Sequence, residues 1–213
     1  KIRKYRESIP DWMDELGVKE LGEETWTKEL AAQNEQAKVI LRVNKLKTTK
    51  EKLRAILMDL NIETEFLKEQ PDALVLKERA NVFLTDAFKE GLFEVQDASS
   101  QLVAPLLDVQ PGMRVVDACA GAGGKTLHIA SLMQNKGQLI AMDLYESKLK
   151  QLKLRAKRNG AFNIEYRIID STKVIKKLQE KADRVLIDAP CSGLGVLKRN
   201  PDSKWKLQPE FID

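Results

Sequence analysis

From Asp97 onward, apolar stretches of strand length alternate with longer helical patterns. The strand-like stretches are VVD (115–117), LIAMD (139–143), RIID (167–170) and VLID (185–188). Strands that alternate with helices of about ten or more residues are typical of a parallel sheet with helices on both faces. The pattern therefore predicts an α/β fold with a doubly wound, mostly parallel, Rossmann-like sheet.

The first 95 residues follow a different pattern, in which short helical and strand-like segments are mixed. The strand-like segments are residues 39–43, 63–67 and 73–77. Residues 48–60 predict a helix with Thr49 as its N-cap. Its expected apolar face consists of Leu53, Ile56, Leu57 and Leu60. We expect two domains, a smaller N-terminal α+β domain over 1–95 and the parallel-sheet domain over 96–213.

Composition limits the classes of protein to consider. Hydrophobic residues make up 43% and charged residues 32%, and no apolar stretch approaches the roughly 20 residues that cross a bilayer. The N-terminus has no apolar signal-peptide core. Two cysteines cannot make a disulfide framework, and a single histidine, His128, makes a zinc site hard to build. We therefore expect a cytoplasmic protein with no metal and no membrane partner.

The net charge of +4 permits nucleic-acid binding without demonstrating it. Two segments are locally basic, residues 148–158 and residues 197–206. We interpret the first as the solvated surface of a helix, which is the commoner explanation for such a run.

Each predicted strand ends in an aspartate, and these are Asp117, Asp143, Asp170 and Asp188. In an open parallel sheet, ligands bind at the carboxyl ends of the strands. One strand-end aspartate is often only a helix N-cap. Four in succession favour a binding crevice, and Asp188 precedes Pro190, so it caps no obvious helix.

A loop of small residues, Asp117 to Thr126, follows the first of these strands. Small residues allow close approach of backbone to a ligand at a helix N-terminus. A phosphate-binding P-loop would need glycine at position 119, which is a cysteine. A dinucleotide dehydrogenase would need a third glycine that is missing. S-adenosyl-L-methionine fits best, because it carries no phosphate and Asp143 and Asp170 supply polar groups for its ribose and adenine.

The segment Asp188-Ala-Pro-Cys191 follows the fourth strand. Carbon 5 of cytosine is a poor nucleophile until a thiolate adds at carbon 6, so its methylation needs an activated cysteine and acid–base groups. A lone cysteine after proline is usually structural. One that follows a strand-end aspartate opposite a cofactor loop favours this chemistry.

These segments together resemble the Nol/Nop/Sun (RsmB-like) family of RNA cytosine-5 methyltransferases. The resemblance covers nearly the whole chain. It is carried by LRVNKLK (41–47), FEVQDASSQLVAPLL (93–107), DACAGAGGKT (117–126), Asp143, Asp170 and DAPCSGLGVLKRNPDSKW (188–205). Ala122 stands where many members have proline.

The resemblance implies that residues 119–125 hold S-adenosyl-L-methionine, with Asp143 on the ribose, Asp170 near the adenine and Asp188 near the methionine end. The residues of this loop are Cys119, Ala120, Gly121, Ala122, Gly123, Gly124 and Lys125. Asp188 and Lys125 would also contact the target cytosine. The family further implies an RNA partner, most directly ribosomal RNA, with transfer RNA as the alternative. Lys198, Arg199, Lys204 and Trp205 would lie beside the RNA.

In this family the nucleophile is the cysteine of a Thr-Cys-Ser motif, and the Pro-Cys cysteine, here Cys191, assists product release. No Thr-Cys-Ser occurs in the 213 residues. We therefore expect a fragment with an incomplete sheet that does not complete turnover. Two alternatives stay open: Cys191 as the sole nucleophile, and a non-catalytic RNA-binding subunit. The N-terminal part, including Arg42 and Asn44, is similar to the family's RNA-recognition-like domain.

Overall fold

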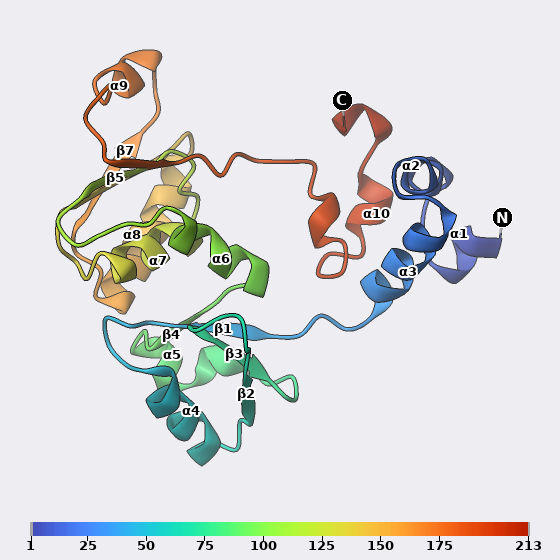
Figure 1. The fold of residues 1–213 in the computed structure, drawn as a ribbon, viewed down its shortest axis with the longest axis horizontal. Helices are drawn as coiled ribbons and strands as arrows, with labels where there is room; N and C mark the ends of the chain where they lie inside the picture. Colours follow the sequence, from blue (N-terminus) through green and yellow to red (C-terminus); the bar gives the residue numbers. More distant parts are fainter. Residues whose placement is uncertain (1, 213) are drawn as a thin grey trace. The chain divides into compact units, whose positions relative to one another are not determined.

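The computed structural model describes residues 2–212, which form two compact units (Figure 1). The central unit comprises Lys38–Ala189, and the terminal unit combines Lys1–Ala37 with Pro190–Asp213. The expected boundary between residues 95 and 96 falls inside the central unit, where the small α+β layer and the parallel sheet are joined. The division into domains at that point stays a prediction.

The small layer of the central unit is an antiparallel sheet with strand order β2-β3-β1-β4. Its strands are β1 (Ile40–Val43), β2 (Thr64–Phe66), β3 (Ala73–Leu76) and β4 (Phe93–Val95). Its helices are α4 (Lys50–Asp59), η1 (Val82–Leu84) and α5 (Asp86–Lys89). The central strand β1 pairs Leu41 with Leu74 on one side and with Val95 on the other.

Helix α4 begins where the sequence predicts, because the Thr49 side chain accepts a hydrogen bond from the backbone N–H of Lys52. Leu53 and Leu57 are fully buried against the sheet. The expected apolar face was too wide, since Ile56 and Leu60 remain 37% and 48% exposed. They border a hollow of about 570 Å³ between α4 and η1.

The larger layer is a parallel sheet with strand order β7-β6-β5-β8. Its strands are β5 (Arg114–Asp117), β6 (Gln138–Asp143), β7 (Ile164–Ile168) and β8 (Arg184–Leu186). Its helices are α6 (Ala98–Leu106), α7 (Gly124–Leu132), α8 (Glu146–Asn159) and α9 (Thr172–Lys176). The predicted α/β fold with a parallel sheet is confirmed, although α9 is shorter than the pattern over residues 171–181 indicated.

Successive residues of β5 and β6 point to opposite faces, as strand geometry requires. Val115 and Leu139 belong to the core beneath α6, α7 and α8, whereas Val116 and Ile140 pack against residues around α9. Both faces therefore carry apolar side chains, which explains why these strands are continuously apolar in sequence.

The terminal unit contains the helices from the two ends of the described chain. They are α1 (Ile2–Arg6), α2 (Asp11–Leu21), α3 (Glu23–Asn34), η2 (Leu194–Val196), α10 (Ser203–Lys206) and η3 (Pro209–Phe211). Its core joins Ile9, Trp26 and Leu30 to Leu197 from the other segment. The Trp26 ring lies against Gly17, where an added Cβ would approach ring atom Cε2 to 2.2 Å. Gly17 therefore allows α2 and α3 to pack closely.

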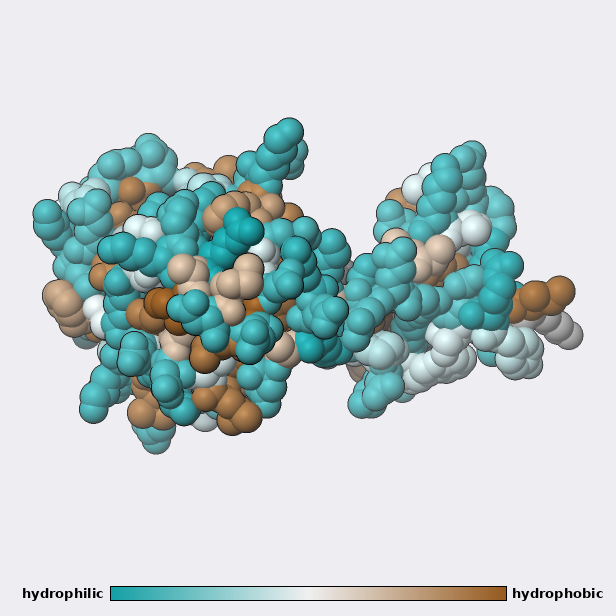
Figure 2. Space-filling model, turned by 90° about the horizontal axis from the view of Figure 1, so that it is seen from below, coloured by the Kyte–Doolittle hydropathy of each residue, from teal (hydrophilic) through white to brown (hydrophobic). Residues whose placement is uncertain are grey.

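The surface in Figure 2 is mainly hydrophilic, with apolar side chains visible in small groups. Among residues 2–212, no helix is both long enough and apolar enough to cross a membrane.

Candidate functional site

The strand-end aspartates lie at the carboxyl edge of neighbouring strands. Asp117 ends β5, and Asp143 ends β6 beside it. Asp170 follows β7 by two residues, and Asp188 follows β8 by two. Because β6 and β8 flank β5 on opposite sides, the direction of the strand order changes at β5. This is the position at which open parallel sheets bind ligands.

The cofactor loop, defined here as residues 119–125, leads from β5 into the N-terminus of α7. Gly123 is the N-cap of α7 with φ 92°, a left-handed conformation that favours glycine. A Cβ at Gly123 would also lie 2.0 Å from Leu152 Cδ1. At Gly121, φ is +54° and a Cβ would meet nothing within 4 Å, so the loop is open there. The loop can therefore admit a ligand close to its backbone.

Asp143 shapes this loop directly. Its Oδ2 accepts a hydrogen bond from the Gly121 N–H at 2.8 Å, and its Oδ1 accepts one from the Tyr145 N–H at 2.9 Å. Each carboxylate oxygen keeps a further lone pair, so the ribose hydroxyls predicted for Asp143 could still be accepted.

Asp117 is a functional candidate that the sequence identified only as one strand end among four. Its side chain is 1% exposed. Oδ2 accepts a hydrogen bond from Thr126 Oγ1 at 2.7 Å, whereas Oδ1 is buried with no hydrogen-bond partner among residues 2–212. Burial, reinforced by the Asp188 carboxylate, raises the pKa of Asp117 to about 6, although the Thr126 hydroxyl, the Cys119 backbone N–H and Lys125 oppose this. An unpartnered buried carboxylate oxygen beside the cofactor loop suits a ligand that brings a donor or a positive charge.

Lys125, at the start of α7, reaches across to the end of β8. Its Nζ donates to Asp188 Oδ2 at 2.6 Å, and the side chains are 20% and 44% exposed. The structure thus brings together two of the three residues predicted to be catalytic. Because both side chains are partly exposed, each can also form a hydrogen bond with a polar group of a bound planar ring.

A cavity of about 670 Å³ lies beside the loop, bordered by Ala118, Cys119 and Ile169. The rest of its lining is largely apolar side chains from β5, β6, β8 and the α9 region. Asp170, the residue predicted near the adenine, follows Ile169 and is exposed. Burial raises the pKa of Cys119, and the carboxylates of Asp117 and Asp143 add to this effect. Cys119 is therefore kept as a neutral thiol, in keeping with a cofactor-lining role rather than a nucleophilic one.

Cys191 and the second basic segment belong to the terminal unit. Cys191 is an exposed free thiol. Lys204 was expected beside RNA, but it is 2% exposed and its Nζ donates to Asn34 Oδ1 at 2.8 Å and to the Glu7 carbonyl at 3.2 Å. That expectation is corrected, because Lys204 holds the terminal unit together. Lys198 and Trp205 remain accessible, although Lys198 pairs with Glu35 at 3.3 Å.

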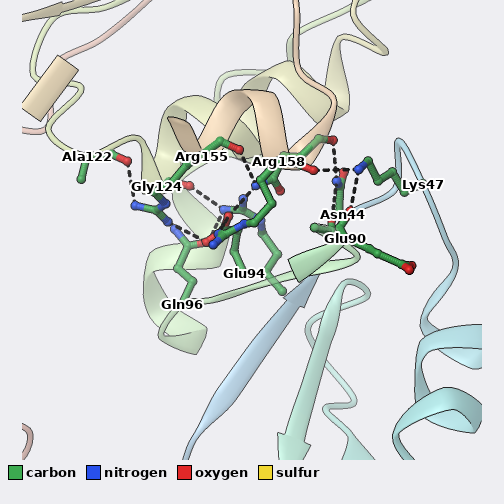
Figure 3. Close-up of polar contacts among 12 residues, drawn as sticks. Asn44, Lys47, Glu90, Glu94, Gln96, Ala122, Gly124, Arg155 and Arg158 are labelled. Atoms are coloured by element: carbon green, nitrogen blue, oxygen red, sulfur yellow. Dashed lines mark hydrogen bonds and ion pairs between the residues drawn. The ribbon is translucent and has the colours of Figure 1, made fainter. Parts of the chain in front are cut away.

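The first basic segment is solvated in part, as the sequence indicated, since its four lysines (Lys148, Lys150, Lys153 and Lys157) are exposed on α8. Arg155 and Arg158 of α8 both bind the buried carboxylate of Glu94 in β4 instead of facing solvent (Figure 3). A helical run of cations gives no sign of an acid 61 to 64 residues earlier, so the sequence offered no signal for this network.

The sheet order, the glycine loop after β5 and the acid after β6 define a cofactor-binding domain of the Rossmann-like methyltransferase class. A family model described as 16S rRNA methyltransferase RsmB/F matches residues 104–213. A second model, described as an RsmF/B-like ferredoxin-like domain, matches residues 9–83. The chain belongs to the 16S rRNA methyltransferase RsmB/F family.

Individual relatives agree with this assignment. The chain is 39% identical over 212 residues to the probable ribosomal RNA small subunit methyltransferase B of Synechocystis sp., covering 96% of this chain and 46% of that protein. It is 37% identical over 204 residues to the protein of the same name from Bacillus subtilis, covering 95% of this chain and 45% of that one. The chain thus spans about half the length of these relatives.

Among solved structures, NSun6 from Pyrococcus horikoshii, crystallised with SFG, superposes with a TM-score of 0.86. The match covers 97% of this chain and 76% of that one at 21% identity, so it bears on the fold alone. The predicted family and fold are confirmed, and S-adenosyl-L-methionine, the predicted cofactor, is the cofactor of this family. The individual site residues stay predictions.

Proposed function

We propose that this chain binds S-adenosyl-L-methionine and RNA and forms the cofactor and base site for methylation of cytosine at carbon 5, with ribosomal RNA as substrate. The observation that carries the proposal is the Lys125–Asp188 pair, which joins the cofactor loop to the end of β8. Membership of a 16S rRNA methyltransferase family supports the ribosomal substrate over transfer RNA.

In the proposed site, the loop 119–125 and Asp143 hold the ribose side of the cofactor, and Asp170 lies near the adenine. Asp117 Oδ1 and Asp188 offer negative charge to the methionine end. The residues present fit the cofactor, because the loop is open at Gly121 and one buried carboxylate oxygen is unpartnered. When bound, S-adenosyl-L-methionine supplies an electrophilic methyl group.

The base would be held by the same pair that joins the loop to β8. The Asp188 carboxylate would accept from the exocyclic amine of cytosine, and the Lys125 ammonium would donate to its carbonyl oxygen. The Asp188 contact would orient the ring, and the Lys125 contact would draw electron density from carbon 6 and so favour addition of a thiolate there. Cys191 then assists release of the methylated base, by analogy with the family.

The cofactor assignment is tested with Asp143→Ala. Loss of a charge-assisted hydrogen bond of about 1.5–3 kcal/mol should weaken S-adenosyl-L-methionine binding roughly 10- to 150-fold in calorimetry. Asp86→Ala, which removes an exposed carboxylate in the small layer, serves as the control and should leave the affinity unchanged. Equal affinity in the Asp143 and Asp86 variants would rule out the ribose role.

The RNA assignment predicts a dependence on salt. For single-stranded RNA, the plot of log affinity against log salt should become flatter by roughly 0.7 for each phosphate that is no longer bound by a cation. We expect this for Lys198→Ala/Arg199→Ala, measured by filter binding. Lys19→Ala/Lys28→Ala removes the same charge from exposed positions of α2 and α3 and should leave the slope unaltered. Identical slopes in the two double variants would show that residues 198 and 199 do not bind RNA phosphates.

A further inference from the structure

A buried acid, Glu94 of β4, lies between the small layer and α8. Its side chain is 4% exposed and binds three groups of α8. Oε2 accepts from Arg155 at 2.8 Å, and Oε1 accepts from Asn159 at 2.5 Å and from Arg158. Burial acts to raise the pKa of Glu94, but Arg155, Asn159 and Arg158 together hold it below its ordinary value. Glu94 is therefore ionised at neutral pH and holds these side chains in position.

Arg155 does more than pair with Glu94. One guanidinium nitrogen binds Glu94, and the other donates to the carbonyl oxygen of Ala122 in the cofactor loop at 2.7 Å (Figure 3). The planar fork of an arginine suits such a bridge between two acceptors. Through Arg155, a residue of the small layer thus determines where a cofactor-loop carbonyl points.

A second arginine reaches the same loop from the small layer itself. Arg42 of β1 is 3% exposed, and its Nη1 donates to the Gly124 carbonyl and to Gln96 Oε1, both at 2.5 Å. Because the peptide unit is planar, fixing the Gly124 carbonyl also fixes the Lys125 N–H. That N–H is one of the first-turn donors of α7 that have no partner within the helix.

We propose that Arg42 and Arg155, held by Gln96 and Glu94, form a clamp through which the small layer sets the conformation of the cofactor loop. They are positioning residues for S-adenosyl-L-methionine, because the loop groups that they bind are the backbone carbonyls of Ala122 and Gly124. The clamp rests on the proposed cofactor site and extends it, because it makes cofactor affinity depend on the small α+β layer as well as on the parallel sheet.

The chain offers a matched control for this clamp. Arg155 and Arg158 lie on the same helix and pair with the same carboxylate, but only Arg155 contacts the loop. Arg158 instead lies over the ring of Phe88, 3.9 Å from its centroid. Arg42 has a similar counterpart in Asn44, whose Nδ2 donates to the carbonyls of Gly91 and Asn159 without reaching the loop.

The experiment compares Arg155→Met with Arg158→Met, and Arg42→Met with Asn44→Ala, at a temperature below all four thermal midpoints. Calorimetry should show S-adenosyl-L-methionine affinity lower by about 10-fold or more in the Arg155 and Arg42 variants only. Arg42→Lys, which keeps one donor, should recover part of the loss. The clamp would be overturned if the two variants of each pair bound S-adenosyl-L-methionine equally well, whether both kept or both lost the affinity of the unaltered chain.

Hydrogen exchange without cofactor separates this inference from the proposed function. Amides of Gly121–Lys125 should exchange about 10-fold faster in Arg155→Met than in Arg158→Met, because a freed carbonyl lets the loop open locally. Equal exchange would overturn the clamp even if the cofactor binds. If the unaltered chain bound no S-adenosyl-L-methionine while this exchange difference was present, the proposed function would fail and the clamp would stand.

Discussion

RNA incubated with the 213-residue chain and methyl-labelled S-adenosyl-L-methionine is expected to gain no label. Methylation at carbon 5 of cytosine requires a covalent adduct at carbon 6, and the Thr-Cys-Ser motif that provides this thiol in the family is not among these residues. Loss of a covalent nucleophile typically lowers turnover by several orders of magnitude. The measurement is tritium transfer to unmodified RNA, with calorimetry on the same preparation to show that the cofactor still binds.

Transfer of label by this chain would show that the nucleophile lies among these 213 residues. Robust turnover by this chain that disappears in Cys191→Ala would make Cys191 the nucleophile. The comparison is Cys119→Ser, which alters the other cysteine of the chain; because Cys119 borders the cavity beside the loop, calorimetry must first show that this variant still binds the cofactor. Turnover lost in the Cys191 variant but kept in the Cys119 variant would assign the adduct to the cysteine that follows Pro190.

Asp117→Asn is expected to stabilise the protein by about 3 kcal/mol above pH 7, at 1.36 kcal/mol per pKa unit between 3.8 and about 6. Burial makes the folded protein bind this proton more tightly than the unfolded chain does. Between those two pKa values the folded state therefore holds more protons, and the free energy of unfolding falls as the pH rises. The advantage of the variant should be largest above pH 6 and should vanish below about pH 4.

Urea unfolding at several pH values measures this difference. Asp170→Asn, a change at an exposed strand end, is the control and should stay within about 0.5 kcal/mol of the unaltered chain. A constant difference across the pH range would show that the Asp117 carboxylate does not titrate as expected. Proteins commonly keep a destabilising charged group where function needs it, and Asp117 fits this pattern.

Much of the fold could be predicted because its signals are local. The apolar strands and the Thr49 cap depend on neighbouring residues, and the structure has them where expected. The strand-end aspartates were found by the same logic, since parallel strands present their carboxyl ends at one edge. The small-residue loop and two of these acids already favoured S-adenosyl-L-methionine, and the resemblance to a known family then agreed with that cofactor.

The remaining features depend on contacts between residues distant in sequence. Nothing near Arg155 indicates that it binds Glu94, and nothing near Lys204 indicates that it lies buried against Asn34. A basic run and a basic loop both suggested surfaces, whether solvated or RNA-binding. For Arg155, Arg158 and Lys204, an acceptor from a distant part of the chain determined the position of the cation.

The terminal unit is assembled from two segments that are separated by the whole of the central unit. Its core cannot close until Leu197 meets Ile9 and Trp26, so its formation has the entropic cost of a very long loop. During synthesis the intervening sheets can fold as soon as they emerge, whereas α2 and α3 must wait for the later segment. We therefore expect α2 and α3 to reach their native packing only after the sheets of the central unit have formed.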